Sequence, residues 1–338
     1  MQSSPRKPLQ IGIARNDRML PLLNHDVSID GYNLEFVQAE PSEIFWRALK
    51  DGEFDVSEMS LAAHAILTSR GENPFVGLPV FTSRMFRHGA VFVSRNSGIS
   101  SPNQLAGRRI GVPEYQMTAA VWMRGILQDD YGVASASVEW LTGGVNMPGR
   151  LERLELRTPP EYRIENIGSQ KTLDAMLRSG EIDALISPQI PDSFKSDDGC
   201  VRRLFENPRA EETAYYDKTR IFPIMHLLVI RRERHEREPD LAQKLLEAFE
   251  QAKKHSFDRL YDGDALHVML PWLISEIEAT MKIMGANYWP YGINENRYVL
   301  ETFVRHLRNQ GLINGDLDIE ALFARDVLAS TRPNGESS

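Results

Sequence analysis

The sequence predicts an α/β fold built as two lobes with a ligand cleft between them. Strand-like and helix-like segments alternate along much of the chain, as in folds whose sheets are covered by helices. The length of 338 residues exceeds what one hydrophobic core comfortably serves, so two units are expected. Two extended apolar segments, 88–94 and 224–232, are placed to carry the chain between these units, and each contains a histidine.

The first unit reads as strands and helices in turn. Residues 41–53 predict a helix, with Pro41 at its start, Ser42 as a candidate cap and an apolar face on one side. Residues 61–71 predict another helix, closed by Gly71. The expected strands are LQIGIA (9–14), LEFVQA (34–39), FDVSEMS (54–60), PFVGLPVF (74–81) and HGAVFVS (88–94).

The second unit repeats this alternation in the middle of the chain. Helices are expected at 101–107, 116–132 and 171–180, each ending in glycine. The strands are RIGVP (109–113), VEWLTGG (138–144), YRIENIG (162–168) and IDALISP (182–188). The segment RIFPIMHLLVIRR (220–232) then returns as a strand, and a mainly helical third follows, led by a clear helix over 239–261.

This order predicts a discontinuous first lobe. Residues 8–93 and 224–330 would form lobe 1, residues 94–223 would form lobe 2, and 331–338 would be a disordered tail. A cleft between the lobes is where α/β proteins hold small ligands.

Composition excludes several classes of function. The formal charge is −8 and the charges are interspersed, so the chain offers no basic stripe for a nucleic acid. Cys200 is the single cysteine, which excludes an intrachain disulfide and a multi-cysteine metal site. The N-terminus lacks the apolar core of a signal peptide, and no apolar run approaches the roughly 20 residues of a membrane span. We therefore expect a cytoplasmic protein without a membrane partner.

The stretch SRMFRH (83–88) concentrates positive charge beside apolar strands. In an extended conformation Arg84 and His88 share one face and Arg87 points the other way. Such arginines pair either with the protein's own acids or with a ligand. Two arginines and a histidine within five residues favour an anionic ligand, because the guanidinium fork matches a carboxylate.

A helix start after GVPEYQMT provides a second candidate anion site. Free backbone N–H groups and the helix dipole favour a carboxylate there, although simple capping of the helix explains the same residues. The candidate ligand-binding residues are Tyr115, Gln116, Met117 and Thr118. The sequence has neither GxGxxG nor GxxxxGK[ST], so no nucleotide cofactor is predicted.

Glu58 and Ser60 end a short strand and begin the next helix. A carboxylate there is ordinarily a partner of the helix dipole, but facing the cleft it would pair with an arginine or relay a proton. No spacing typical of a metal site occurs, although Glu58, His88 and His226 are able in principle to converge on one; we predict no metal.

Six blocks together resemble the 4,5-dihydroxyphthalate decarboxylase family: DVSEMS, PVFTSRMFRH, GVPEYQMTAAVWMRGILQDDYGV, GEIDALI, RIFPIMH and YWPYGINEN. The resemblance runs from the first strand to about Ala329. That family is similar to type 2 periplasmic solute-binding proteins, which agrees with the two-lobed prediction. The resemblance implies a carboxy-lyase that converts 4,5-dihydroxyphthalate, or a related hydroxylated aromatic carboxylate, to 3,4-dihydroxybenzoate and CO₂, without any cofactor, in phthalate catabolism.

That chemistry assigns roles to the candidate residues. Direct loss of CO₂ would leave an unstable aryl carbanion, so the ring carbon that bears the carboxylate must be protonated first. Arg84, Arg87 and the start of the 116–132 helix would hold the two carboxylates. His88 or His226 would be the acid, while Glu58 or the other histidine would take the phenolic proton.

Two other functions remain open at this point. One is a solute-binding protein that holds an aromatic carboxylate without turnover, and the other is a different cytosolic lyase on the same fold. The C-terminal helices pack either on their own lobe or on a second copy in a homo-oligomer, and the sequence does not decide between these arrangements.

Overall fold

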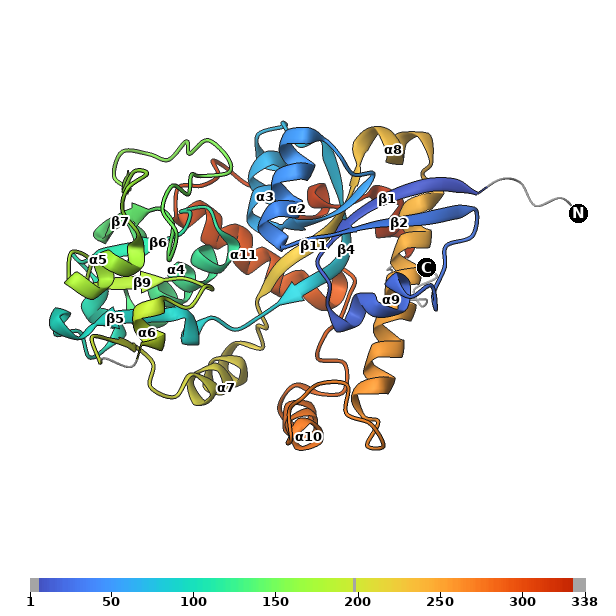
Figure 1. Cartoon of the computed structure of the whole chain (residues 1–338). Helices are drawn as coiled ribbons and strands as arrows, with labels where there is room; N and C mark the ends of the chain where they lie inside the picture. The colour runs from blue at the N-terminus through green and yellow to red at the C-terminus, as the bar shows by residue number, and fades with distance from the viewer. Residues whose placement is uncertain (1–5, 197–198, 331–338) are drawn as a thin grey trace, which may run out of the picture.

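The structure is a computed structural model that describes residues 6–196 and 199–330 (Figure 1). The predicted disordered tail, 331–338, lies outside these residues. Two sheets stand side by side, each covered by helices, so the predicted two-lobed α/β architecture is confirmed. None of the helices in the described residues has the length and apolar character that a membrane crossing requires.

The first lobe is built on a five-stranded sheet with the order β2-β1-β3-β11-β4. Strand β1 runs parallel to β2 and β3, while β11 runs antiparallel to both β3 and β4. Strand β11, the last of the five in sequence, therefore lies between β3 and β4, in a sheet whose other strands come from the start of the chain. The bounds are β1 (Lys7–Ile13), β2 (Tyr32–Gln38), β3 (Val56–Ser60), β4 (Phe75–Arg84) and β11 (Ile224–Arg231).

Helices of both chain ends cover this sheet. Helix α2 packs on β3, and the long helix α9 packs on β4 and on α1. Glu40 rather than Ser42 precedes the first turn of α2, with Pro41 at the first helical position. The bounds are α1 (Leu20–Leu23), α2 (Pro41–Trp46), α3 (Leu61–Ser69), α8 (Arg232–Arg237), α9 (Asp240–Leu260) and α12 (Arg325–Ser330).

The second lobe is built on a six-stranded sheet with the order β10-β5-β9-β6-β7-β8. Strands β6, β7, β8 and β9 are parallel where they pair, and β5 and β10 add an antiparallel edge. The bounds are β5 (Val91–Ser94), β6 (Arg109–Val112), β7 (Glu139–Thr142), β8 (Arg163–Asn166), β9 (Ala184–Ile186), β10 (Val201–Arg203), α4 (Thr118–Tyr131), α5 (Leu173–Ser179) and α6 (Asp192–Lys195).

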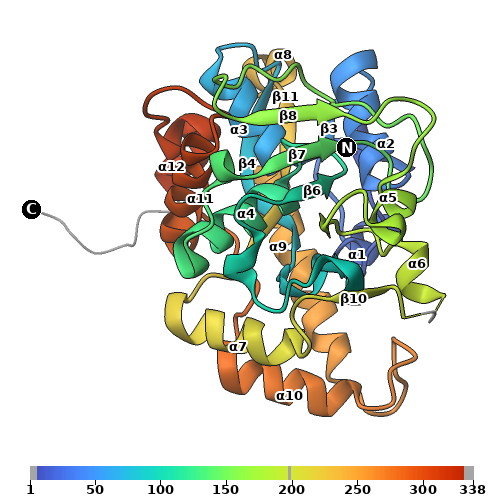
Figure 2. The ribbon, with the colours of Figure 1, turned by 90° about the vertical axis from the view of Figure 1, so that its left-hand side faces the viewer.

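The chain passes from the first sheet to the second through residues 85–90. Because β5 belongs to the six-stranded sheet, the predicted boundary at residue 93 falls inside a strand of the second lobe. The chain returns through α7 (Pro208–Thr219), which lies beside α10 (Leu273–Met284) beneath the lobes (Figure 2). The sequence did not predict α7 or β10. Helix α7 has only a weak apolar face, and strand β10 is three residues long.

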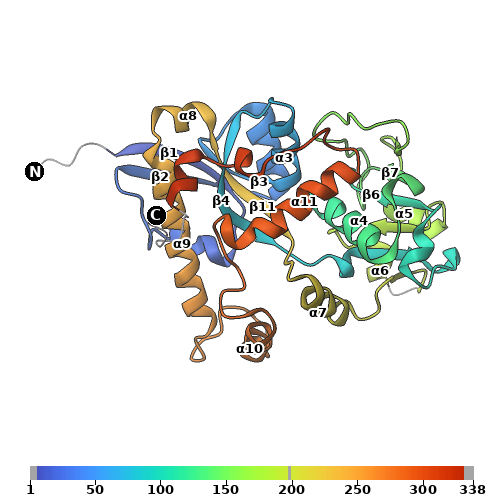
Figure 3. The same cartoon turned by 180° about the vertical axis from the view of Figure 1, so that it is seen from behind.

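The C-terminal helix α11 (Arg297–Asn309) packs against α4 of the second lobe (Figure 3). Phe303 of α11 lies 5.1 Å from the ring of Trp122, centroid to centroid. Gln310, fully buried at the end of α11, accepts hydrogen bonds from Arg124 and Tyr115 and donates one to the carbonyl of Val121. This part of the predicted first-lobe segment 224–330 therefore contacts the second lobe intimately.

Candidate active site between the lobes

A cavity of about 630 Å³, here called the interlobe cavity, lies between the two sheets. Its first-lobe wall comes from α2, the end of β3 and the start of β11. Its second-lobe wall comes from the crossing segment 85–90, the start of α4, a loop over 150–153 and the segment after β9. The volume is typical of small-molecule sites, and its position between lobes is the one predicted.

Strand pairing brings Glu58 and His226 together beneath this cavity. In the β3–β11 ladder His226 stands opposite Ser60, so Glu58, two residues earlier on β3, is its diagonal neighbour on the same face. Nδ1 of His226 lies 2.7 Å from Oε1 of Glu58. The ring of Phe45 packs edge-on against the imidazole, with centroids 4.8 Å apart.

Glu58 is held as a carboxylate despite being 1% exposed. Burial alone would raise its pKa, but the hydrogen bond and the charge of His226 outweigh burial, so the pKa lies below its ordinary value. The N–H of Ala14 donates to the other oxygen at 3.0 Å. Because a carboxylate only accepts, Nδ1 of His226 must donate, which leaves Nε2 as the nitrogen available to the cavity that His226 lines.

Arg87 brings a guanidinium to the cavity without a protein carboxylate of its own. Its Nε contacts the sulfur of Met225 at 3.4 Å, and no ion pair to Arg87 is found among the described residues. Burial lowers its pKa to about 10, a value at which the side chain is still charged at neutral pH. A partly buried cation without an ion pair is costly, so Arg87 is the clearest mark of an anionic ligand.

Two further arginines line the cavity, and sequence reasoning missed both. Arg150 and Arg153 donate to the same oxygen of Glu114, at 2.6 Å and 3.1 Å from their terminal nitrogens. Glu114 is 2% exposed and also accepts from Nε of Arg150 and from the backbone N–H of Arg153. Three guanidinium charges, counting Arg87, stand against two carboxylates, the buried Glu114 and the exposed Glu40 that also lines the cavity, so the wall has an excess of one positive charge.

Helix starts complete the cavity floor. Ser60 caps α3, and its hydroxyl lies 2.9 Å from the hydroxyl of Thr118, the first residue of α4. Thr118 also accepts from the N–H of Ala62 at 3.1 Å, so a second-lobe side chain satisfies a helix of the first lobe. Ser60, Met117 and Thr118, three of the candidate binding residues, line the cavity, and the dipoles of α3 and α4 favour an anion there.

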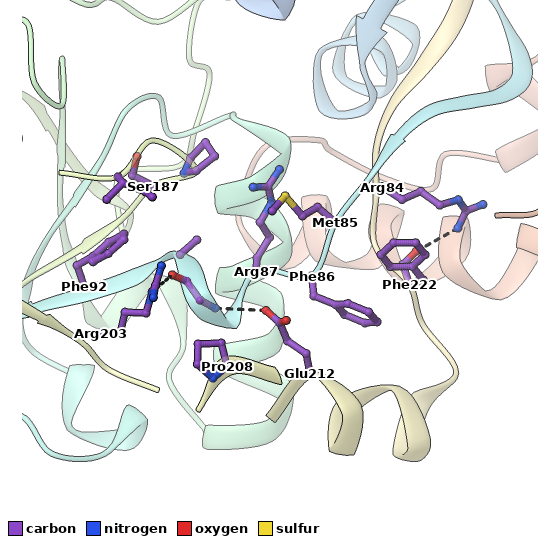
Figure 4. Close-up of a pocket in the computed structure, with 14 residues that line it drawn as sticks. Arg84, Met85, Phe86, Arg87, Phe92, Ser187, Arg203, Pro208, Glu212 and Phe222 are labelled. Atoms are coloured by element: carbon purple, nitrogen blue, oxygen red, sulfur yellow. Dashed lines mark hydrogen bonds between the residues drawn. The ribbon is translucent and has the colours of Figure 1, made fainter. Parts of the chain in front are cut away.

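Arg84 and His88 are not brought to this cavity. The guanidinium of Arg84 points away from Arg87 and donates to the carbonyl oxygens of Phe222 and Pro290, at 3.1 Å and 2.8 Å, and to Asn296 (Figure 4). Burial lowers its pKa to about 9. These bonds satisfy Arg84 within the first lobe, which is the structural role the sequence left open.

His88 lies in an aromatic setting of the second lobe. Its ring packs 5.2 Å from that of Phe205 and 5.3 Å from that of Tyr215, and it is 1% exposed. Burial lowers its pKa to about 4, so this imidazole is neutral at pH 7 and is not among the residues that line the interlobe cavity.

Tyr115 and Gln116 are also held behind the cavity wall. Tyr115 is fully buried, with its hydroxyl on the carbonyl of Gln310 and its backbone N–H on Glu152. Gln116 is 3% exposed and donates to the carbonyl of Leu154 at 3.1 Å. Both residues fix the turn that presents Met117 and Thr118, rather than lining the cavity themselves.

Metal-ligating side chains do not gather at this site. Across residues 6–196 and 199–330, no three His, Cys, Asp or Glu side chains lie close enough together to hold a metal ion. Glu58 and His226 form a pair, whereas His88 belongs to the aromatic cluster described above.

Comparison with known proteins connects this site to a family. No family model matches the chain. It is 38% identical over 315 residues to a 4,5-dihydroxyphthalate decarboxylase of Comamonas testosteroni, covering 93% of this chain and 96% of that one. It is 39% identical over 208 residues to a 4,5-dihydroxyphthalate decarboxylase of Pseudomonas putida, covering 62% of this chain and 81% of that one.

Solved structures share the fold at low sequence identity. The periplasmic aliphatic sulphonate binding protein SsuA of Escherichia coli aligns with a TM-score of 0.50 at 14% identity, covering 95% of this chain and 92% of that one. The periplasmic sulfonate-binding protein SsuA of Methylobacillus flagellatus KT aligns with a TM-score of 0.51 at 14% identity, covering 96% and 93%. The fold is thus that of periplasmic solute-binding proteins, and by sequence the chain belongs to the 4,5-dihydroxyphthalate decarboxylase family, whose members are carboxy-lyases.

Proposed function

We propose that the chain decarboxylates 4,5-dihydroxyphthalate, or a closely related hydroxylated aromatic dicarboxylate, to 3,4-dihydroxybenzoate and CO₂. Family membership supports the reaction class. The observation that carries the proposal is the Glu58–His226 pair, beside a cavity lined by Arg87, Arg150 and Arg153. Three guanidinium groups suit an aromatic acid with two carboxylates.

The reaction sets three physical requirements. Each carboxylate of the substrate lies para to a hydroxyl, so electron density from that oxygen is able to reach the ring carbon that carries the carboxylate. Protonation of this carbon, with loss of the para hydroxyl proton to solvent, gives a dienone; departure of CO₂ restores the aromatic ring, and the oxygen takes a proton back. The site must therefore hold the dianion, deliver a proton to one carbon and tolerate the loss of one negative charge.

His226 is the group we assign to proton delivery. His226 lines the cavity and its Nδ1 is fixed on Glu58, which leaves Nε2 for the substrate, orients the ring and stabilises the imidazolium before transfer. The proton leaves Nε2 for the ring carbon, the carbon–carbon bond breaks, and its electron pair stays in the ring. Solvent then returns one proton to His226, so the overall reaction consumes one H⁺ and converts a dianion to a monoanion and CO₂.

The arginines and the apolar residues divide the remaining work. We assign the retained carboxylate to the guanidinium groups of Arg87 and Arg153. The leaving carboxylate would lie beside Phe45 and Met117, where the less polar surroundings favour the neutral CO₂ over the anion. Equal binding of both carboxylates in the ground and transition states would give no acceleration, so this asymmetry matters.

The test is direct. Purified protein incubated with 4,5-dihydroxyphthalate should release CO₂ and 3,4-dihydroxybenzoate, and in D₂O the product should carry one deuterium at the carbon that lost its carboxylate. His226→Asn should lose about 100-fold or more in turnover. His88→Asn is the matched control, because that imidazole is buried outside the cavity. Equal turnover in the wild type and His226→Asn would refute the assignment.

A solute-binding protein is the second candidate, favoured by the fold of the solved structures. It predicts that the wild type binds the dicarboxylate without forming product. Cytoplasmic location and a homo-oligomeric state remain predictions; cell fractionation and sedimentation of the purified chain test them.

A further inference from the structure

A second cavity of about 470 Å³, here called the crossing pocket, adjoins the first at the segment that joins the lobes (Figure 4). It is lined by that segment, by residues after β9, by the end of β10 and by the start of α7. Arg87 and Pro188 line both cavities, so a single arginine stands between them. Nothing in the proposed reaction uses this pocket.

Arg203 is the second cation of the crossing pocket. Its Nε donates to the carbonyl of Gly89 at 3.0 Å, and its guanidinium carbon lies 4.9 Å from the ring centroid of Phe194 and 5.8 Å from that of Phe92. No ion pair to Arg203 is found within the described part of the chain. The carbonyl and the two rings orient the guanidinium and leave its terminal nitrogens without a protein acid.

Glu212 is the acid that lines the pocket. Its Oε1 accepts from the backbone N–H of Gly89 at 3.3 Å, and it attracts both Arg87 and Arg203 through space without forming an ion pair with either (Figure 4). Arg84 contributes to the wall, but its guanidinium is directed away and satisfied by carbonyl groups. Two arginines facing the pocket against one carboxylate leave an excess of one positive charge.

Aromatic and proline side chains form the rest of the wall. Phe86, Phe92 and Phe222 line the crossing pocket together with Pro188 and Pro208. Flat apolar surfaces beside a guanidinium suit an aromatic ring that carries one carboxylate. The volume exceeds what a single benzene ring with a carboxylate needs and falls within the range of ordinary ligand sites.

We propose that the crossing pocket is a second binding site, for an aromatic monocarboxylate, built on Arg203 and sharing Arg87 with the interlobe cavity. This inference rests on the proposed function for the identity of its ligand, because the reaction converts a dianion to an aromatic monoanion. One guanidinium cannot give its full hydrogen bonding to carboxylates in both cavities. Occupation of the crossing pocket therefore weakens binding of the dicarboxylate, and the effect is reciprocal.

Titration calorimetry with 3,4-dihydroxybenzoate tests the site directly. The wild type should bind two equivalents per chain, and Arg203→Met should bind one, since the charge is lost while the apolar stem still packs on Phe194. The lost contact weakens binding in the crossing pocket by about tenfold to hundredfold. Arg163→Met is the matched control: it removes an exposed arginine of the same sheet, and both equivalents should remain.

Glu212→Gln should change the affinity of the crossing pocket in the direction opposite to Arg203→Met. Removing the one acid that lines the pocket should tighten binding of the monocarboxylate there, so the proposal does not depend on loss of binding alone. A single equivalent in the wild type, or two unchanged equivalents in Arg203→Met, would overturn the proposal. So would weaker binding in Glu212→Gln.

Kinetics separate this inference from the proposed reaction. Because occupation of the crossing pocket weakens substrate binding, added 3,4-dihydroxybenzoate should raise the apparent KM of the wild type, and the slope replot should curve upward because two molecules bind. In Arg203→Met the replot should be linear. A curved replot that persists in Arg203→Met refutes the shared-arginine mechanism. If the chain shows no turnover, the proposed function fails, while the binding stoichiometry still decides whether the crossing pocket is a site.

Discussion

Arg84 and Arg87 lie three residues apart, but replacing them should affect two different properties of the protein, its stability and its substrate recognition. Arg87 lines the interlobe cavity and forms no ion pair with a carboxylate among the described residues. Arg84 instead donates hydrogen bonds to carbonyl oxygens of its own lobe. We expect Arg87→Met to impair substrate recognition and leave the fold intact. We expect Arg84→Met to destabilise the fold and leave recognition nearly unchanged. The two variants are matched in chemistry and in sequence position.

The expected size of each effect follows from the hydrogen bonds that the substitution removes. A hydrogen bond to a charged group contributes about 1.5–3 kcal/mol net, so Arg87→Met should lower kcat/KM roughly 10- to 150-fold. Arg84→Met would leave the carbonyl of Phe222 and the buried Oδ1 of Asn296 without their donor, at about 1–3 kcal/mol each, while the carbonyl of Pro290 keeps a hydrogen bond from Asn296. The free energy of unfolding should therefore fall by about 2–6 kcal/mol, a large share of the stability of an ordinary protein.

Two measurements check this reasoning. Initial rates of 3,4-dihydroxybenzoate formation give kcat/KM, and urea denaturation followed by circular dichroism gives the free energy of unfolding. The reasoning is wrong if Arg87→Met keeps the wild-type kcat/KM. It is also wrong if Arg84→Met keeps the wild-type stability but loses substrate recognition, because the two side chains would then have exchanged roles.

Three further predictions concern the Glu58–His226 pair, the buried His64 and the contact between helices α4 and α11. Glu58→Gln should lower kcat about tenfold or more with little change in KM, because the amide no longer stabilises a charged His226; unchanged kcat would exclude Glu58 from proton transfer. Burial lowers the pKa of His64 from 6.5 to about 4. The unfolded chain therefore binds a proton at His64 more readily than the folded protein does. The contribution of His64 to the free energy of unfolding should be complete above pH 6.5 and decline between pH 6.5 and 4. Melting temperatures across that range should show the decline, and the slope should be shallower in His64→Asn. Gly125→Ala would place a methyl group 2.1 Å from the ring of His306. The free energy of unfolding, measured by urea denaturation, should fall by about 1–3 kcal/mol. An unaltered urea midpoint would mean that α4 and α11 separate easily.

Local patterns predicted much of the fold because burial dictates them. The apolar strand candidates at 9–14, 34–39 and 54–60 all lie in the first sheet, and the amphipathic segment 116–132 contains α4. The segment 88–90 is instead a single 3₁₀ turn before β5, since only the residues from Val91 onward pair with other strands. Short elements of this kind carry too few residues for a periodic signal.

The site was harder to predict, for two physical reasons. Glu58 and His226 are 168 positions apart, and their contact exists because β11 inserts beside β3, a pairing that no local pattern encodes. Arg150 and Arg153 lie on a loop without hydrophobic periodicity, so the sequence gives no facing direction for them. Their spacing of three residues beside the acidic Glu152 was the available signal, and it is equally typical of a solvated segment.

Alternation along an extended segment did carry information about the arginines. The sequence placed Arg84 and Arg87 on opposite faces, and in the structure their guanidinium groups point apart (Figure 4). What alternation does not reveal is which face meets a ligand and which meets backbone carbonyls. That distinction depends on Pro290 and Asn296, more than 200 residues further along the chain.

The buried amide of Gln310 has a consequence for anyone who wishes to dissect or redesign this chain. Its side chain and carbonyl satisfy Arg124, Tyr115 and Val121, so the middle segment of the polypeptide depends on its far end for polar partners. Excising 94–223 as an autonomous module would leave these groups and Trp122 without cover. Grafts of new specificity onto this scaffold therefore need to be made in the full-length protein.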